Sequence, residues 1–198
     1  MKDKVRLILD LPINLFCNCG LDPQSLYFDA DIAGLKIENR NEIQILKKLL
    51  PLIDKPLMLR ADDEILPEIL QTVDRKCIIG IVTEKNYKSI VPKAVEKEHT
   101  VIIRTPIDIN LAKEMNILTG EMGLENILID TDIGGLGYGF EYGYSIMEKI
   151  KIEGKNDKYL NKPLISFAVE ETLKSKEAKK NPLYLEITAA SAIIAAGA

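Results

Sequence analysis

The chain has 198 residues, of which 46% are hydrophobic and 28% are charged, and its formal net charge at pH 7 is −4. This composition is sufficient for one sizeable core, and we expect a single domain over residues 1–198. The interspersed charges exclude the strongly basic surface of a nucleic-acid-binding protein, and no apolar run reaches the roughly 18 residues that cross a bilayer.

Short apolar segments alternate with amphipathic ones, which is the pattern of a parallel sheet covered by helices. The predicted strands lie, in chain order, within residues 5–16, 35–39, 56–61, 77–83, 100–106, 126–132 and 163–169. Apolar residues at three- and four-residue spacing predict helices over 41–53, 63–73, 84–98, 109–123, 140–154 and 169–180. We expect Pro92 to kink or shorten the third of these helices.

The number of these strand–helix units favours a (βα)8-type barrel over a small open sheet. Residues 182–198 are predicted to form a short strand or turn and then an apolar, alanine-rich helix that ends in Gly-Ala. A barrel typically needs about 250 residues, so one strand and its helix are missing or the barrel is closed in another way. The predicted fold class is therefore α/β, of the TIM-barrel (βα)8 type, incomplete or truncated.

The most distinctive segment is ILIDTDIGGLGYGFEYGYSIMEKI, residues 127–150. A dinucleotide fingerprint fails because Phe140 stands where its third glycine should be, and a P-loop fails because no Lys-Ser/Thr follows the glycines. Two interpretations remain. Backbone N–H groups at the start of the helix near residue 140 could hold an anion, or the glycines permit positive φ angles in a tight corner.

Polar residues follow most of the predicted strands, and in a barrel such positions face the ligand site. Asp130 and Asp132 could pair with Arg60 or Arg104 or act on a proton, although carboxylates at such places often only cap helices or form ion pairs. The strand-end residues are Asn39, Arg60, Asp62, Thr83, Glu84, Arg104, Asp108, Asn110, Asp130, Asp132 and Glu170.

The three cysteines and the single histidine offer little for catalysis. Cys17 and Cys19 form a C-x-C pair and Cys77 lies within a predicted buried strand. A zinc or iron–sulfur site usually needs four ligands, so no metal site within one chain is expected, although the C-x-C pair could join a shared site or act as a redox pair. The odd cysteine count favours reduced thiols in a cytoplasmic protein. His99 precedes a strand, and we predict that it is a surface or turn residue.

From about residue 105 to 198 the sequence resembles a known family. The segments are DINLAKEMN (108–116), MGLENILIDTDIGGLGYGFEYGYSIMEKIK (122–151), SKEAKK (175–180) and LEITAASAIIAAGA (185–198). They resemble the corrinoid iron–sulfur protein subunits of the acetyl-CoA decarbonylase/synthase complex, and the small (delta) subunit most closely.

The resemblance implies a TIM barrel of the dihydropteroate-synthase-like type. It also implies a role in moving a methyl group between a tetrahydropterin, a corrinoid and acetyl-CoA synthase. The corrinoid would be held mainly by a partner chain, either the corrinoid/iron–sulfur large subunit or a second copy, with a pterin methyltransferase as a further partner. The cofactor-binding residues carried over from the family pattern are Asp108, Asn110, Asp130, Gly135, Gly137, Tyr138, Gly139 and Tyr142, and Asn116, Glu141, Tyr144 and Glu186 also match it.

The chain departs from the family pattern in several places. It lacks a four-cysteine motif and a D-x-H-x-x-G corrinoid loop, Thr131 replaces a proline and Leu185 replaces a tryptophan. These departures indicate a shortened member, a remnant or a paralog of the family. The leading hypothesis is a non-catalytic subunit of a methyl-transferring complex. Two alternatives stay open: a pterin-dependent methyltransferase that binds its pterin through Asp62, Asn110 and Asp130, and a degenerate paralog that acts as an assembly or scaffold protein.

Overall fold

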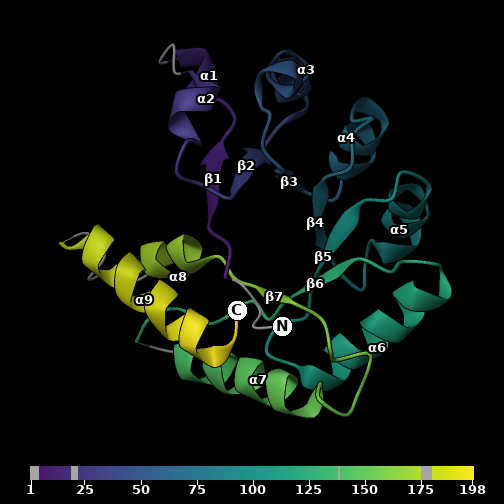
Figure 1. Cartoon of the computed structure of the whole chain (residues 1–198), viewed down its shortest axis with the longest axis vertical. Coiled ribbons are helices and arrows are strands. Elements are labelled where there is room, and N and C mark those ends of the chain that lie inside the picture. Colours follow the sequence, from purple (N-terminus) through teal and green to yellow (C-terminus); the bar gives the residue numbers. More distant parts are fainter. Residues whose placement is uncertain (1–4, 19–21, 138, 175–179) are drawn as a thin grey trace. The chain divides into compact units, whose positions relative to one another are not determined.

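The computed structural model describes residues 5–18, 22–137, 139–174 and 180–198 (Figure 1). Its seven described strands have the order β1-β2-β3-β4-β5-β6-β7 in one sheet, so strands that follow one another in sequence are also neighbours. Helices separate consecutive strands, which is the alternation of a (βα) barrel. By their packing the residues form two compact units, Met1–Val101 with Met122–Asn126 (unit 1) and Ile102–Glu121 with Ile127–Ala198 (unit 2).

Unit 1 contains the first four strands and their helices. The strands pair in parallel, and Thr100 at the start of β5 donates its backbone N–H to the Cys77 carbonyl at 3.0 Å. The strands are β1 (Ile8–Pro12), β2 (Ile32–Ile37), β3 (Leu57–Ala61), β4 (Ile78–Val82) and the beginning of β5 (Thr100–Arg104). The helices are α1 (Leu15–Asn18), α2 (Pro23–Leu26), α3 (Ile43–Leu49), α4 (Leu66–Thr72) and α5 (Tyr87–Glu96), with 3-10 turns η1 (Arg40–Glu42) and η2 (Leu50–Leu52) around α3.

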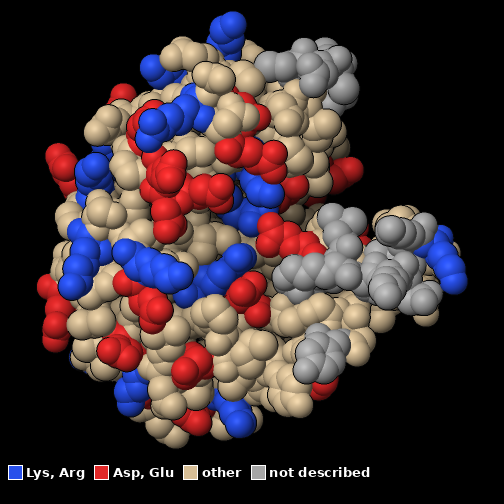
Figure 2. Space-filling model, turned by 180° about the vertical axis from the view of Figure 1, so that it is seen from behind, with Lys and Arg blue, Asp and Glu red and all other residues tan. Residues whose placement is uncertain are grey.

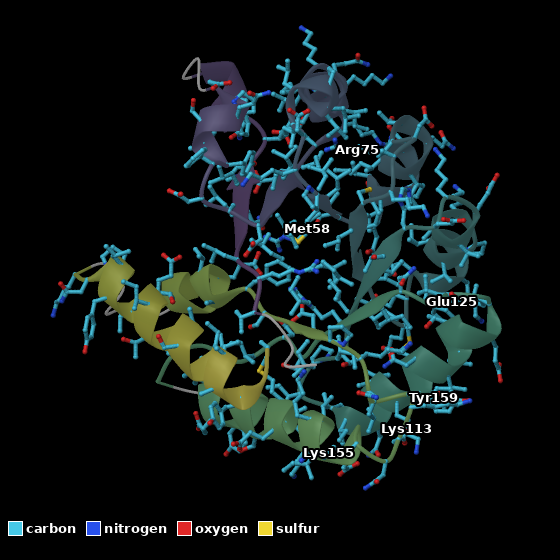
Figure 3. The ribbon with its side chains drawn as sticks, in the orientation of Figure 1. Met58, Arg75, Lys113, Glu125, Lys155 and Tyr159 are labelled. Atoms are coloured by element: carbon cyan, nitrogen blue, oxygen red, sulfur yellow. The ribbon has the colours of Figure 1, made fainter. Side chains whose placement is uncertain are left out.

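The two faces of the unit 1 sheet differ in chemistry. Successive side chains of a strand point to opposite faces, so residues paired in register share one face. Leu35, Leu59 and Ile79 form one apolar row with no exposed surface. The opposite face has Asp10 beside Gly34 and Met58, and Figure 3 shows Met58 pointing away from α3 and α4. This face therefore carries charge as well as apolar side chains.

Unit 2 contains the end of β5 and two further strands. The backbone N–H of Thr105 donates to the Asp130 carbonyl at 2.8 Å, and that of Ile129 donates to the Pro163 carbonyl at 2.9 Å. The strands after β5 are β6 (Ile127–Asp130) and β7 (Leu164–Ile165), and the helices are α6 (Ile109–Glu121), α7 (Phe140–Glu153), α8 (Ala168–Lys174) and α9 (Pro182–Ala196). Helix α9 packs on α7 and α8 (Figure 1), and its Ala189, Ile193 and Ala196 are buried.

Two of the predicted elements need comment. Of the short strand or turn expected from residue 182, the strand is wrong, because Pro182 occupies the first turn of α9, where its missing N–H costs no hydrogen bond. Pro92 lies inside α5, which continues beyond it to Glu96 but is shorter than the predicted range 84–98. The helix predicted over residues 169–180 includes residues 175–179, which lie outside the described residues, so this part of the prediction is not compared.

The surface is charged and mixed in sign. On the face shown in Figure 2, lysine and arginine side chains are interspersed with aspartate and glutamate side chains. Among the described helices, none is long and apolar enough to cross a membrane.

Candidate functional site

The carboxyl ends of the unit 2 strands bring one cation and three carboxylates together. Arg104 ends β5, and its Nε donates to Asp130 Oδ2 at 2.6 Å. Its two terminal nitrogens lie 3.7 Å from Asp132 Oδ1 and 3.7 Å from Glu170 Oε2. The four residues, which we call the Arg104 cluster, carry a net formal charge of −2, from one positive and three negative side chains.

Strand geometry and one unusual turn explain why two aspartates reach the same arginine. Asp130 is paired beside Arg104 through the β5–β6 backbone bond from Thr105. The strand ends at Asp130, and Asp132 has a φ of 46°, a left-handed conformation that aspartate tolerates better than most residues. The Asp132 N–H then donates back to Asp130 Oδ1 at 2.9 Å. Asp130 is therefore held at both carboxylate oxygens.

Opposing effects act on the pKa values in the cluster, because its central carboxylate is buried. Asp130 is 2% exposed. Burial raises the pKa of the Asp130 carboxyl, and the Arg104 charge and the N–H of Asp132 oppose this rise. Burial acts to lower the pKa of the Arg104 guanidinium, but Asp130, Asp132 and Glu170 outweigh it and raise that pKa.

Aromatic and hydroxyl side chains complete the lining. The Arg104 guanidinium carbon lies 5.7 Å from the Phe167 ring centroid, within the range of a cation–π contact. Ser166 Oγ is buried and has no hydrogen-bond partner among the described residues. The depression that these side chains line has essentially no volume that would admit a water molecule. In this conformation the ion pairs themselves fill the site, so a ligand could enter only if side chains moved.

The glycine-rich segment after Asp130 builds a tight corner. A Cβ on Gly134 would lie 2.6 Å from the Gly139 carbonyl carbon, and a Cβ on Gly143 would lie 2.4 Å from Ile133 Cγ2. Gly137 and Gly139 have φ angles of 89° and 99°, which side chains rarely adopt. The corner interpretation of these glycines is thus confirmed. The anion-binding interpretation stays a prediction.

The remaining predicted site residues take different places around this corner. Asp108 Oδ1 accepts the backbone N–H groups of Asn110 and Leu111 at 2.8 and 3.1 Å, so it caps the start of α6. Asn110 and Tyr142 are exposed, and Gly135 is half-buried. Tyr138 lies outside the described residues. The structure therefore groups Asp130 with Arg104, Asp132 and Glu170, while Asp108 serves the helix.

Asn116, which matches the family pattern, has a structural role. Its Nδ2 donates to the Tyr159 carbonyl at 2.6 Å, and Lys113 Nζ on the same helix pairs with Asp157 at 2.7 Å. Figure 3 shows Lys113 and Tyr159 side by side. These contacts fasten α6 to the segment that precedes β7.

Unit 1 contains a second ion pair, largely buried, that was not anticipated. Arg60 on β3 donates its Nε to Asp10 Oδ2 on β1 at 2.7 Å, and its Nη2 binds the same oxygen. The structure thus gives Arg60 a partner other than Asp130, to which Arg104 binds. Strand β2 lies between β1 and β3, and its Gly34 is paired with Asp10. A Cβ on Gly34 would lie 2.8 Å from Asp10 Cα. The sequence contained one indication of this ion pair, because Asp10 is the only charged residue in the apolar run that follows Arg6.

Of the two alternatives predicted for His99, a surface residue or a turn residue, the surface one is wrong. His99 is 1% exposed, and its Nδ1 accepts the Cys77 backbone N–H at 3.3 Å and lies 3.5 Å from Cys77 Sγ. The short segment between α5 and β5 turns the ring inward, and burial lowers the pKa of His99. His99 also lines an open depression of about 360 Å³ in unit 1, together with Val95, Glu98, Gly123, Leu124, Glu125 and Asn126.

The cysteines can be compared with the prediction only in part. Cys77 is buried, as predicted, and burial raises the pKa of its thiol to about 12. Cys19 lies outside the described residues, and nothing is described of the Cys17 side chain. Within the described ranges, no three His, Cys, Asp or Glu side chains are grouped so that they could hold a metal ion.

Residues 29–197 match the CO dehydrogenase/acetyl-CoA synthase delta subunit family. The acetyl-CoA decarbonylase/synthase complex subunit delta of Methanocaldococcus jannaschii is 32% identical over 114 residues, which are 56% of this chain and 27% of that protein. The Methanopyrus kandleri subunit is 30% identical over 96 residues (47% and 24%), and the Archaeoglobus fulgidus subunit is 28% identical over 136 residues (63% and 30%). The chain thus aligns with only about a quarter to a third of the length of these curated relatives.

Solved structures support the fold independently of sequence. A dihydropteroate synthase from Xanthomonas albilineans, solved with 4-aminobenzoic acid, has a TM-score of 0.69 over 99% of this chain and 85% of that chain, at 12% identity. One from Clostridium difficile, solved with pteroic acid, has a TM-score of 0.61 over 100% and 90%, at 17% identity. The predicted fold, an incomplete dihydropteroate-synthase-like barrel, is confirmed.

Proposed function

The chain belongs to the CO dehydrogenase/acetyl-CoA synthase delta subunit family, and from this premise we propose that it acts in the acetyl-CoA pathway as the barrel subunit of a corrinoid-dependent methyl-transfer system. The methyl group moves between a tetrahydropterin, a corrinoid and acetyl-CoA synthase. This chain supports the transfer without catalysing it, and the corrinoid is held mainly by a partner chain. The observation that carries the proposal is the family match over residues 29–197.

The surface that we assign to this role is the carboxyl end of the unit 2 strands. It comprises the corner after Asp130 and the start of α6 and α7, with Asp108, Asn110, Asp130, Gly135, Gly137, Tyr138, Gly139 and Tyr142. Two observations support a contact with a partner-held group. Tyr142 is 62% exposed, as a residue that docks onto another surface must be, and the adjoining Arg104 cluster leaves no volume for an enclosed ligand.

We also propose that residues 1–198 fold as one barrel domain and that the chain works in the cytoplasm. Its partner is the corrinoid/iron–sulfur large subunit, with a pterin methyltransferase as a further partner. The chain on its own holds no cofactor tightly.

The test is purification of the affinity-tagged chain from its native host, followed by an absorption spectrum of the material that co-purifies. We expect the absorption bands of a corrinoid and a larger partner polypeptide. Tyr142→Ala should remove both. Ile152→Ala is the matched control, because Ile152 is on the same helix and is 63% exposed. A colourless preparation without partner, obtained from cells that make the corrinoid protein, would overturn the proposal.

The second candidate is a pterin-dependent methyltransferase. The similarity of the fold to dihydropteroate synthases favours this alternative. Isothermal titration of the purified chain with methyltetrahydrofolate separates the two. Saturable heat that is lost in Asp130→Asn would favour the enzyme, and no heat at millimolar ligand would exclude it. A degenerate paralog that acts as a scaffold would bring down a partner but neither corrinoid nor pterin.

A further inference from the structure

A basic residue stands shortly before each of three consecutive strands. Lys55, Arg75 and Lys97, which we call the entry cations, precede β3, β4 and β5 by two or three residues. Each side chain reaches back to backbone carbonyls in the segment that leads to the preceding strand. The bonds are Lys55 Nζ to the Phe28 and Ala30 carbonyls at 2.7 and 2.5 Å, Arg75 (labelled in Figure 3) to the Ile53 and Lys55 carbonyls at 2.6 and 3.5 Å, and Lys97 Nζ to the Val73 carbonyl at 2.9 Å.

The segment that leads to β6 breaks this series. Residues 122–126 contain no lysine or arginine, and Glu125 stands two residues before the strand. The segment that leads to β2 also lacks a basic residue, but there Asp31 Oδ2 makes the connection by accepting the Leu7 N–H at 2.9 Å. Between the segments that lead to β5 and β6 lies the open depression of about 360 Å³. Its volume is within the range of small-ligand sites.

The lining of this depression suits a positively charged group. The described residues that line it include Glu98 and Glu125, both exposed, and no lysine or arginine, while Val95 and Leu124 supply an apolar part. Glu98 pairs with Lys76, but both side chains are largely exposed, so this pair contributes little and can be exchanged for another. Glu98 has a φ of 53° and follows the carboxyl end of α5, where the helix dipole also favours positive charge.

The buried histidine adds a second requirement. His99 also lines the depression, and its Nδ1 accepts the Cys77 N–H, so the neutral ring carries its proton on Nε2. Nε2 is buried and has no hydrogen-bond partner among the described residues. A buried donor without an acceptor is costly. A ligand that completes this site must therefore bring an acceptor oxygen as well as a positive charge.

We propose that the depression binds the amino terminus of a partner polypeptide. The ammonium group lies between Glu98 and Glu125, as an entry cation supplied from outside the chain. The first carbonyl oxygen accepts the His99 Nε2–H, and the first side chain lies against Val95 and Leu124. A simple amine would leave the histidine unpaired, and a free amino acid would bring its carboxylate towards two glutamates, which like charges oppose.

The experiment is a nuclear magnetic resonance titration of the full chain, labelled with nitrogen-15 in histidine. His99 is the only histidine, so the imidazole signals report on this site alone. The probe is leucinamide, whose α-amino group is largely protonated at neutral pH and stands beside a carbonyl. We expect a saturable shift of the Nε2 signal in the millimolar range, because so small a ligand makes few contacts. N-acetylleucinamide, which has the same carbonyl and side chain without the charge, should cause no shift at these concentrations.

Two variants locate the binding, each with a matched control. Glu98→Gln should raise the half-saturating concentration at least about threefold, whereas Glu96→Gln, which is exposed nearby but does not line the depression, should not. Gly123→Asn should abolish the shift, because asparagine tolerates the positive φ of 91° and its side chain would occupy the depression beside Val95. Gly120→Asn, where a Cβ meets nothing within 4 Å, should behave as wild type.

Thermal melts confirm that each variant is folded. The absence of a shift at high millimolar leucinamide, or an equal shift with N-acetylleucinamide, would overturn the proposal. So would a shift that persists unchanged in both Glu98→Gln and Gly123→Asn. Free leucine that binds as tightly as leucinamide would overturn the assignment to a polypeptide terminus. None of these outcomes depends on whether the chain serves methyl transfer.

Discussion

Replacement of Arg104 by leucine tests whether the Arg104 cluster is held by its buried ion pair. Asp130 is 2% exposed, and Arg104 Nε, 2.6 Å away, is its nearest positive charge. Unit charges about 4 Å apart attract by about 4 kcal/mol at an effective dielectric constant of about 20. Removing one partner of a buried pair typically costs about 3–5 kcal/mol, because the remaining charge stays buried without compensation. We expect Arg104→Leu to lower the free energy of unfolding by this amount at neutral pH.

The control is the complementary change and the double variant. Asp130→Asn keeps the shape and an acceptor for the Asp132 N–H, and it leaves Arg104 near Asp132 and Glu170, so it should cost only about 1–2 kcal/mol. Arg104→Leu with Asp130→Asn removes the unpaired charge altogether. The double variant should therefore be more stable than Arg104→Leu alone, which is strong non-additivity.

The cost of Arg104→Leu should depend on pH in a defined direction. Burial already raises the pKa of Asp130, and without Arg104 the main opposing influence is gone. A carboxyl whose folded pKa exceeds its unfolded pKa binds its proton more tightly in the folded state, so its contribution to stability is lost as pH rises through the folded value. The deficit of Arg104→Leu should shrink from neutral pH to about pH 5. Urea titrations followed by circular dichroism measure it. A loss below about 1 kcal/mol, or additive single changes, would refute the reasoning.

Three further predictions concern glycine packing, the buried histidine and the buried thiol. Gly143→Ala should lower the unfolding free energy by about 1–3 kcal/mol, because its Cβ would lie 2.4 Å from Ile133 Cγ2. In contrast, Gly120→Ala, whose Cβ meets nothing within 4 Å, should stabilise α6 by about 0.5–1 kcal/mol. Thermal melts of the two variants measure this difference, and equal effects would contradict the packing described around Gly143. Burial lowers the pKa of His99 below 6.5, so the folded state binds fewer protons than the unfolded state, and stability should fall as pH drops from 6.5 through the folded pKa. His99→Asn should reduce the pH dependence of the urea midpoint in this range. An unchanged pH dependence in the variant would refute the role of His99. With the other two cysteines replaced by alanine, Cys77 should not react with a thiol reagent at about pH 8 until urea unfolds the chain, since burial raises its pKa to about 12, and rapid native labelling would contradict its burial.

The periodic pattern located the strands and helices, because apolar strands covered by amphipathic helices repeat regularly in a barrel. Boundaries were less predictable. The strand expected over residues 163–169 is only Leu164–Ile165. The helix Pro182–Ala196 begins where a short strand or turn was expected. Both segments are short apolar runs whose periodicity does not distinguish helix from strand, so local context decides.

The candidate site was predictable where sequence order implies spatial order. Arg104 and Asp130 end neighbouring parallel strands, which is why their pairing could be anticipated among the alternatives. Asp10 could not be assigned to Arg60, because nothing local in the sequence specifies which face of β1 carries its charge. His99 was misjudged because a polar residue in a loop is usually exposed, and its burial depends on a tertiary contact with Cys77.

The parallel order of the strands in unit 1 has a consequence for how the chain folds as it leaves the ribosome. Each strand pairs with the strand that follows it in sequence: Ile8 lies opposite Ile32, Ala33 opposite Leu57 and Met58 opposite Ile78. Every pairing therefore closes a segment of similar, modest length, and the entropy of loop closure grows only slowly with length. Because no strand of this group waits for a distant partner, each can join the sheet as it is synthesised, before the next one emerges. Synthesis from the amino end would then leave one growing edge at a time exposed to other chains.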